Sequence, residues 1–485
     1  MHETYRAHVG EIEQGLGAFA FKSTDLMLLT DGTDAIKSFE DQWATGDGKA
    51  RLSGRTPLML ERDRILYSDE LRRQADKHHT LFHKRQRVSR DYTTHTLRVA
   101  QVARSVGRRL GLNSDLAEAI AFGSKVGGVA FLHVAKKTVD DWICERLREV
   151  DDATARSEPK TETYQEALLD VAEDGSITLP KWITALRAGE VRGSVARYLP
   201  WAAGSAALPA YSSGQQSYWL LSTNPFLLRA KPAYTPQTMY GVWRHSLEAT
   251  PDANTFRHRI TVLAEGGPSQ LRLTEEHLTH EAVVVRYADD ITWVIENLNE
   301  ANTAASLAGE RNSVFGLLAL ELDSEQLPDA LHRALQPVGN AGGLYTYFID
   351  DLVRTSAERF QASDVGPINE TEPLVALSGH AARILRLMKE FLSARVFSDD
   401  RIRLRNHTLE VISRTILDLL YESQAEALVE VIERRGKIEM WPPSELERAL
   451  KLAANDATHR VQACVDAFSL MSDRDVYDFI GLEAL

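Results

Sequence analysis

The spacing of apolar residues along this chain is that of α-helices. Over residues 96–110, apolar side chains recur every three or four positions and form a wide stripe, made of Leu97, Val99, Ala100, Val102, Ala103, Val106 and Leu110. Ser114 and Asp115 then offer an N-cap and an early acid for a second helix. Similar patterns at 281–297, 376–395, 409–435 and 443–470 predict further helices.

Strand patterns are scarce, and RITVL at 259–263 is the best candidate for a short hairpin. The sequence therefore predicts a mainly α fold with at most a short β-hairpin. We expect an N-terminal extension at 1–50 and a core at 51–300. A polar insertion at about 151–193 would interrupt the core, and a helical C-terminal region would follow at 301–485.

Composition limits the classes of function. The 485 residues carry 56 basic and 69 acidic side chains, a net charge of −13, which argues against a surface that coats nucleic acid. With two cysteines, a disulfide framework or a cysteine-ligated zinc site is not expected. We find no secretory signal and no apolar run of about 20 residues that would span a membrane. A cytoplasmic protein is the expectation.

One segment has the frame of a metal-site helix without its ligands. Residues 119–136 read AIAFGSKVGGVAFLHVAK, which resembles the pattern A-x-x-x-G-H-D-x-G-H-x-P-F-G-H-x-x-E of the deoxyguanosine triphosphate triphosphohydrolase (dGTPase) branch of the HD superfamily. The matching residues are Gly123, Gly127, Phe131 and His133. The departures are Ser124 and Lys125 at the His-Asp pair, Gly128 at the next His, Ala130 at the Pro and Lys136 at the closing Glu.

Other blocks resemble the same family in the same order. The early blocks are RTP at 55–57, ERDRI at 61–65, SDELRR at 68–73, Lys77 and THTL at 94–97. The later blocks are YSSGQQS at 211–217, YT at 234–235, EA at 281–282, ADDITW at 288–293 and DAFSLMSDR at 466–474. The resemblance implies an HD-domain helical core that the C-terminal region completes.

In that family, an H…HD…D set holds a divalent metal through imidazole and carboxylate groups, which suit Mn, Fe, Co, Ni or Zn. The metal polarises the α-phosphate and a water molecule so that triphosphate leaves. Carried over residue by residue, His95 is the first ligand and Asp289 the last. Ser124 and Lys125 replace the other two ligands, so the resemblance implies that no metal binds here.

Lys125 puts an ammonium where the family has a carboxylate. Two unit charges about 4 Å apart near a protein surface interact with on the order of 4 kcal/mol, so this exchange disfavours a divalent ion. One expectation is that Lys125 pairs with Asp289 and fills the metal position. The alternative is that Lys125 turns out to solvent, because lysine stems often snorkel.

The resemblance also assigns residues around the metal. The Arg three residues before the first His is Tyr92, and the Glu three residues after it is Arg98. His133 matches a His of catalytic type, but its Glu partner is Lys136, so a core or surface role is the alternative. Candidate nucleotide-binding positions are Arg72, Arg73, Trp293 at a sugar-pocket Tyr, Asn297 at a sugar-contacting Asp, Asp473 and Arg474. Ion pairs between helices would explain the four charged members equally well.

A basic stretch suggests a different chemistry. It consists of Lys84, Arg85, Arg87, Arg90, Arg104, Arg108 and Arg109, which could face the phosphates of a nucleotide or of single-stranded nucleic acid. Ordinary exposed helix charges would give the same sequence.

Three functions follow from these observations. The missing ligands favour a non-catalytic member of the family, a pseudoenzyme that acts as a nucleotide-binding, regulatory or structural subunit and needs no cofactor. Since the family assembles as oligomers, commonly hexamers, a homo-oligomer or a mixed oligomer with an active paralogue is expected. The alternatives are an active dNTP triphosphohydrolase with Mn or Mg in an altered site, and a module that binds single-stranded DNA.

Overall fold

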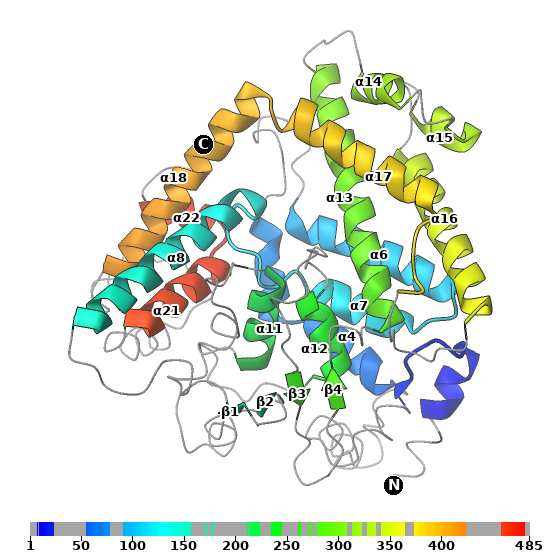
Figure 1. The fold of residues 1–485 in the computed structure, drawn as a ribbon, viewed down its shortest axis with the longest axis horizontal. Coiled ribbons are helices and arrows are strands. Elements are labelled where there is room, and N and C mark those ends of the chain that lie inside the picture. The colour runs from blue at the N-terminus through cyan, green and yellow to red at the C-terminus, as the bar shows by residue number, and fades with distance from the viewer. Residues whose placement is uncertain are drawn as a thin grey trace.

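Helices dominate the computed structural model of the chain, as predicted (Figure 1). The structure describes residues 7, 9–23, 55–77, 91–156, 170–171, 177–178, 211, 213–223, 234–244, 260–262, 271–273, 279–307, 313–322, 327–335, 341–363, 373–422 and 457–480. No helix within these ranges is both long and apolar enough to cross a membrane.

The first half of the described chain contains η1 (Glu13–Gly15), α4 (Pro57–Leu66), α5 (Asp69–Arg72), η2 (Arg73–Asp76), α6 (Tyr92–Arg109), α7 (Ser114–Gly123), α8 (His133–Arg156), α11 (Ser213–Thr223) and α12 (Pro236–Arg244). The second half contains α13 (His280–Leu307), α14 (Val314–Glu321), α15 (Asp329–Ala334), α16 (Ala341–Gln361), α17 (Gly379–Phe391), the π-turn η6 (Leu392–Val396), α18 (Asp400–Glu422), α21 (Ala457–Leu470) and α22 (Asp473–Ile480).

Two short antiparallel ladders are the β structure of the described residues. β3 (Ile260–Val262) pairs with β4 (Leu271–Leu273), with Thr261 opposite Arg272, which confirms the hairpin predicted at 259–263. β1 (Asp170–Val171) pairs with β2 (Ile177–Thr178) inside the predicted insertion, where no strand was predicted.

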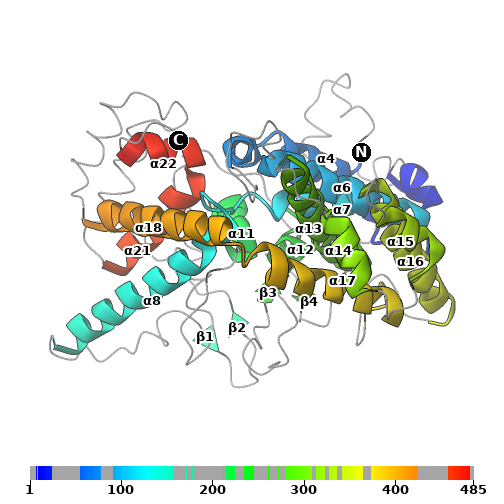
Figure 2. The same cartoon turned by 90° about the horizontal axis from the view of Figure 1, so that it is seen from above.

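The buried side chains form two apolar cores. The first lies among α4, α6, α7, α12, α13, α16 and α17, and the second among α8, α18, α21 and α22. The two groups occupy opposite sides of the molecule in both views (Figures 1 and 2). Helix α18 contributes to both cores, since Ile402 belongs to the first and Leu409 to the second.

Helix α6 has a strongly amphipathic pattern, and most of its predicted stripe is buried. Leu97 is the exception, because it is 50% exposed and shares its face with Gln101 and Arg108 rather than with the core. The cap of the following helix also differs from the prediction. The side chain of Asn113, one residue before Ser114, accepts hydrogen bonds from the N–H groups that open α7.

The later helices match the predicted segments with shifted ends. α13 covers the predicted segment 281–297 and continues to residue 307, and α17 lies inside 376–395. α18 begins at residue 400, earlier than the predicted start at 409. Residues 423–456, where the remainder of the last two predicted helices falls, lie outside the described part of the chain.

The described part of the predicted N-terminal extension packs against the first core. Phe21 is fully buried, and Phe19 stacks on Phe360 of α16 with ring centroids 4.4 Å apart. The carboxylate of Glu281, at the start of α13, accepts hydrogen bonds from the N–H of Phe21 at 3.0 Å and of Asn113 at 2.9 Å. One buried carboxylate therefore joins the N-terminal segment, the start of α7 and α13.

Burial raises the pKa of Glu281 from 4.5 to about 7. Because the folded pKa lies above the unfolded one, the folded state takes up a proton in this window, and stability falls as the pH rises from 4.5 through 7. Both of these hydrogen bonds go to Oε1. A glutamine can therefore keep both bonds without burying a charge.

We therefore expect Glu281→Gln to gain stability relative to the wild type between pH 5 and pH 8, by on the order of 3 kcal/mol. The measurement is urea unfolding at both pH values. Glu281→Ala, which loses both hydrogen bonds, should be less stable than Glu281→Gln throughout. A constant difference between Glu281→Gln and the wild type at the two pH values would contradict the assignment.

Candidate functional site

The retained His and Asp of the sequence pattern face each other across two packed helices. His95 on α6 places Nε2 3.2 Å from Oδ1 of Asp289 on α13. Its Nδ1 lies 2.6 Å from Oε2 of Glu296, which stands seven residues after Asp289 on the same helix. Two helical turns separate the carboxylates, so both lie on the face of α13 that packs against α6. Both imidazole nitrogens therefore have carboxylate partners.

Lys125 completes this cluster. It follows the end of α7, it is 3% exposed, and its Nζ lies 2.6 Å from Oδ2 of Asp289. The predicted ion pair is thus present, and the alternative of a solvent-facing lysine is wrong. Burial by itself would lower the pKa of the ammonium, but the carboxylate of Asp289 outweighs it and raises the pKa of Lys125 above its usual range. The lysine is therefore cationic at neutral pH.

Ser124, the other replacement, does not face the cluster. Its hydroxyl donates to the carbonyl of Ala121 at 2.9 Å, and its own carbonyl accepts from the hydroxyl of Ser217 on α11. The serine is fully buried, and it serves the packing of the turn that ends α7. It adds no ligand to the cluster.

These residues do not fit a divalent metal. Within the described part of the chain, no group of three or more His, Cys, Asp or Glu residues is arranged to hold an ion. Oδ1 of Asp289 is engaged by His95 and Oδ2 by the lysine ammonium. A divalent cation bound to Asp289 would meet the positive charge of Lys125 at short range.

Gly128 stands where the family pattern has its next His, and the side chains of two other departures from that pattern lie beside it. A Cβ added at Gly128 would lie 2.9 Å from Cδ2 of Leu132 and 3.1 Å from Cε1 of Tyr92. Tyr92 stands at the position of the family Arg, and Leu132 at the Gly before His133 in the quoted pattern. The departures at Gly128, Tyr92 and Leu132 therefore pack together. The side chains of Tyr92 and Leu132 occupy the space that an imidazole at residue 128 would need.

The turn before His133 is strained. Phe131 and Leu132 have φ angles of 59° and 48°, in the left-handed region that glycine tolerates best. The N–H of Phe131 donates to Oδ1 of Asp473 at 2.7 Å, at the start of α22. Asp473 thus has an assigned partner, while Arg474 is exposed and pairs with Asp478 of its own helix. Of these two predicted positions, only Asp473 contacts the site.

His133, at the start of α8, points its ring at Trp293 in an edge contact with centroids 6.4 Å apart. The pKa of His133 is lowered to about 4, first by desolvation among the surrounding atoms and then by His95 and Lys125. His133 is nevertheless exposed, and with its lowered pKa the ring is neutral at neutral pH. Lys136, one helical turn later, is exposed. The carboxylate of Asp289 acts to raise the pKa of His133, but desolvation and the influence of His95 and Lys125 outweigh it.

The predicted sugar-pocket positions are turned toward the protein. The side chain of Asn297 donates to the carbonyl of Trp293 at 2.7 Å, one turn back on α13. Trp293 contacts Phe397, with centroids 5.7 Å apart, just after the π-turn. Arg98 at the position of the family Glu bonds Glu296 at 2.6 Å. An aromatic and amide lining thus replaces the Tyr and Asp that the resemblance implies.

Two important residues were missed by the sequence prediction. Glu296 binds both His95 and Arg98, and its spacing of seven residues from Asp289 is the signal that could have found it. Lys77, recognised only as part of a motif, is fully buried and donates to the carbonyls of Gly128 and Ser469. Desolvation lowers the pKa of Lys77 to about 7. It ties the strained turn to α21.

Gly127, one of the matching glycines, allows α11 to approach. A Cβ at residue 127 would lie 2.3 Å from the backbone nitrogen of Ser217, so a larger residue would push the helix away. The N–H of Gly127 donates to the hydroxyl of Ser217 at 2.8 Å, and its carbonyl accepts from the hydroxyl of Tyr211. The retained frame therefore has a packing role that is independent of metal chemistry.

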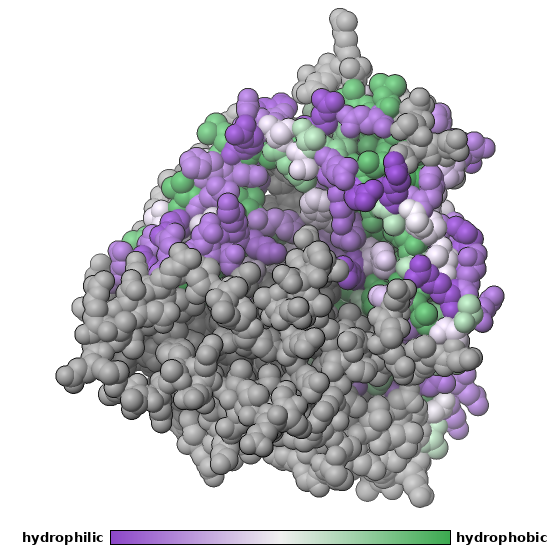
Figure 3. All heavy atoms as spheres, viewed as in Figure 1, coloured by the Kyte–Doolittle hydropathy of each residue, from purple (hydrophilic) through white to green (hydrophobic). Residues whose placement is uncertain are grey.

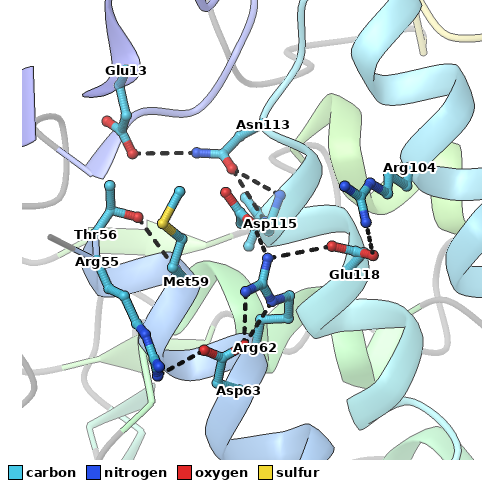
Figure 4. A network of polar contacts seen from close by, with 11 residues as sticks. Glu13, Arg55, Thr56, Met59, Arg62, Asp63, Arg104, Asn113, Asp115 and Glu118 are labelled. Carbon is cyan, nitrogen blue, oxygen red and sulfur yellow. Dashed lines mark hydrogen bonds and ion pairs between the residues drawn. The ribbon is translucent and has the colours of Figure 1, made fainter. Parts of the chain in front are cut away.

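The opening blocks of the motif form a polar network instead of a ligand site (Figure 4). Arg62 on α4 binds Asp63, Asp115 and Glu118, and Arg55 binds Asp63 at 2.9 Å. These contacts tie α4 to α7. Arg72 and Arg73, two of the predicted nucleotide-binding positions, come after α4 in the chain. Arg72 is exposed and Arg73 is buried.

The basic stretch is partly explained by helix contacts. Arg104 lies 3.4 Å from Glu118, and Arg109 lies 2.6 Å from Asp350 of α16. These pairs favour the structural interpretation over a phosphate-binding face for the two arginines. Residues 84–87 and Arg90 lie outside the described residues.

Comparison with known proteins agrees with the motif assignment. No protein-family model matches the chain. The chain is 40% identical over 87 residues to a deoxyguanosinetriphosphate triphosphohydrolase-like protein of Clostridium tetani. The matched region covers 18% of this chain and 25% of that protein. Proteins of the same name from Caulobacter sp. and Desulfatibacillum aliphaticivorans are 43% identical over 82 residues and 34% identical over 118 residues. These matches cover 17% and 23% of this chain, and 21% and 34% of those proteins.

The chain is a relative of the deoxyguanosinetriphosphate triphosphohydrolase-like proteins. It spans between a fifth and about a third of the length of these relatives. The shared segment supports the dGTPase-like family, and the residues of the site described above determine what this member can do.

The Lys125–Asp289 pair should contribute strongly to stability, because both groups are largely buried. We expect Lys125→Met to lower the free energy of unfolding by about 3 kcal/mol, since it leaves the carboxylate without its cation. Adding Asp289→Asn should recover part of this loss. The exposed pair Lys389–Asp290, 2.8 Å apart on the neighbouring position, is a matched control. Lys389→Met should cost less than about 1 kcal/mol in urea unfolding. Equal losses for the two lysines would refute the prediction.

The strained turn gives a second prediction. At an ordinary position, glycine is less stabilising than alanine. At Leu132, with φ of 48°, we expect Leu132→Gly to be more stable than Leu132→Ala by about 1 kcal/mol, because only the glycine relieves the backbone. Both variants lose the same contacts beyond Cβ, so their difference in urea unfolding isolates the strain. An alanine variant as stable as the glycine variant would show that the turn is relaxed.

Proposed function

We propose that the chain is a non-catalytic dGTPase-like protein, in which a lysine ammonium takes the position of the catalytic metal. The observation that carries this proposal is the 2.6 Å contact between Nζ of Lys125 and Oδ2 of Asp289. A tethered monovalent cation neutralises the carboxylate, but it has no vacant coordination position for water or phosphate.

The partners of the other anionic groups support the same conclusion. Glu296 is bound to His95 and Arg98, so it is not available as a replacement for the missing ligands. Metal sites that lack ligands or their supporting contacts lose affinity and activity. The apolar packing of Tyr92 and Leu132 around Gly128 also takes up the room beside the cluster.

As a relative of oligomeric enzymes, such a protein would act as a structural or regulatory subunit, in a homo-oligomer or with an active paralogue. A nucleotide bound to it would be held without a bridging metal, next to Trp293 and Asn297. The active-enzyme alternative rests on His95 and Asp289 alone, and both of these side chains are occupied by protein partners. The DNA-binding alternative is weakened by the paired Arg104 and Arg109.

Metal analysis of the purified protein tests the proposal. We expect less than about 0.1 equivalent of bound Mn, Fe, Co, Ni or Zn by mass spectrometry, given the lost ligands and the buried cation. Triphosphate release from dGTP should equal that of a His95→Ala variant with Mn, Mg, Co or Ni. Lys125→Asp, which adds a carboxylate next to Asp289, should bind Mn²⁺ more tightly than the wild type in calorimetry.

One combination of results would contradict the proposal. Stoichiometric metal in the wild-type protein, together with turnover above that of His95→Ala, would mean that the altered site is active. Circular dichroism of each variant would show that the comparison is made between folded proteins.

A further inference from the structure

Helix α18 carries an apolar stripe on its outer face. Leu404, Val411 and Leu419 are large apolar residues of this helix that are 70%, 52% and 41% exposed. Apolar side chains are visible along the edge of the molecule that α18 occupies (Figure 3). The helix runs along the outer edge of the molecule in Figure 1.

Two threonines join these residues into a continuous stripe. Thr408 and Thr415 are exposed, and their hydroxyls donate to the carbonyls of Leu404 and Val411, each at 2.9 Å. Because each hydroxyl is bonded within the helix, the methyl group is the part that a partner would meet. The stripe is therefore apolar from Leu404 to Leu419.

The stripe lies opposite the face that α18 uses in the protein. The inward residues pack in the two cores and are Ile402, Leu409, Ile416, Leu417 and Leu420. At 100° per residue, their mean direction differs from that of Leu404, Thr408, Val411, Thr415 and Leu419 by about 140°. One side of α18 thus packs in the cores, and the side that carries the stripe is exposed.

The stripe reads the same in both directions. Around a point between Val411 and Ile412, Leu404 is placed symmetrically with Leu419, and Thr408 with Thr415. An antiparallel copy of the helix, related by a twofold axis through this point, would pack leucine on leucine and threonine on threonine. Such self-complementarity is what an isologous contact requires.

We propose that α18 is a homodimer interface, in which the helix pairs antiparallel with α18 of a second copy of this chain. This deepens the subunit role proposed above and rests on it for the expectation that the chain assembles.

The charges at the helix ends favour the antiparallel direction. Arg401, which is 65% exposed and held by Asp399, is placed symmetrically with Glu422 in the last turn. Antiparallel packing brings Arg401 opposite Glu422 of the second copy at both ends. Parallel packing would instead place Arg401 against Arg401, and it would align the two helix dipoles unfavourably.

The size of the contact sets its strength. The 23 residues of α18 span about 34 Å at 1.5 Å per residue. A single helix pair is smaller than the standard interface of about 1,600 Å², so we expect a dissociation constant on the order of 10 μM. Dimer formation should therefore depend on concentration in the micromolar range.

Sedimentation equilibrium of the full chain, over about 1–200 μM, tests the proposal. Val411→Arg places two like charges at the twofold axis and should weaken the dimer at least about tenfold. Leu320→Arg is the matched control, because Leu320 on α14 is 75% exposed and lies outside the stripe. A wild type that stays monomeric at the highest concentration, or a Val411→Arg variant that associates as strongly as Leu320→Arg, would overturn the proposal.

Cysteine cross-linking tests the direction. Thr408 faces Thr415 of the other copy only in the antiparallel pair, so Thr408→Cys mixed with Thr415→Cys should give a disulfide-linked heterodimer. Neither variant alone should link, since its two cysteines would be about 10 Å apart along the axis. Linking of Thr408→Cys with itself would indicate a parallel pair and overturn the antiparallel model.

These outcomes are separable from the proposed function. Neither Val411 nor Leu320 belongs to the lysine-occupied site, so both variants should keep the metal content of the wild type. A metal-loaded active protein that still dimerises through α18 would contradict the proposed function alone. A metal-free protein that does not dimerise would contradict the interface alone.

Discussion

The arrangement of this site depends on one buried ion pair, between Lys125 and Asp289. The packing of α6 against α13 brings His95 close to Asp289 and Glu296, which collects negative charge in a poorly solvated place. Such a cluster needs a cation, because unpaired carboxylates are costly to bury. The lysine supplies that cation from within the chain, so charge balance does not depend on binding an ion. The charge of Asp289 is thus neutralised by an ammonium that the chain itself carries.

Other departures from the family pattern pack around the same turn. Tyr92 and Leu132 fill the space beside Gly128, and this packing holds Leu132 in a left-handed conformation. Strain of this kind persists only where the surroundings fix the backbone. Here the surroundings include Asp473, which accepts from Phe131, and Lys77, which bonds the turn to α21. The C-terminal helices therefore complete the turn that precedes α8.

The sequence predicts the helical class and the position of the motif, because apolar periodicity and matched residues are local signals. It also identifies Lys125 as a cation near Asp289, but it leaves open whether the two meet, since a lysine stem allows both outcomes. The spacing from Asp289 places Glu296 on the same face of its helix, but periodicity does not show that this face packs against the helix that carries His95. Leu97 belongs to the predicted apolar stripe but is half exposed, because the periodicity does not show how far the neighbouring helices cover that stripe. The exposed nature of Arg474, beside the buried Asp473, likewise depends on how α22 docks.

The π-turn between α17 and α18 lies between the cluster around Asp289 and the outer stripe of α18. The N–H of Phe397 bonds the carbonyl of Leu392 at 2.8 Å, and this wider turn seats Phe397 against Trp293. Trp293 in turn contacts His133 at the start of α8. An aromatic contact beside the His95–Asp289–Lys125 cluster thus lies at the start of α18. Because α8 also packs on α18, these contacts help to set the direction in which the outer stripe of α18 faces.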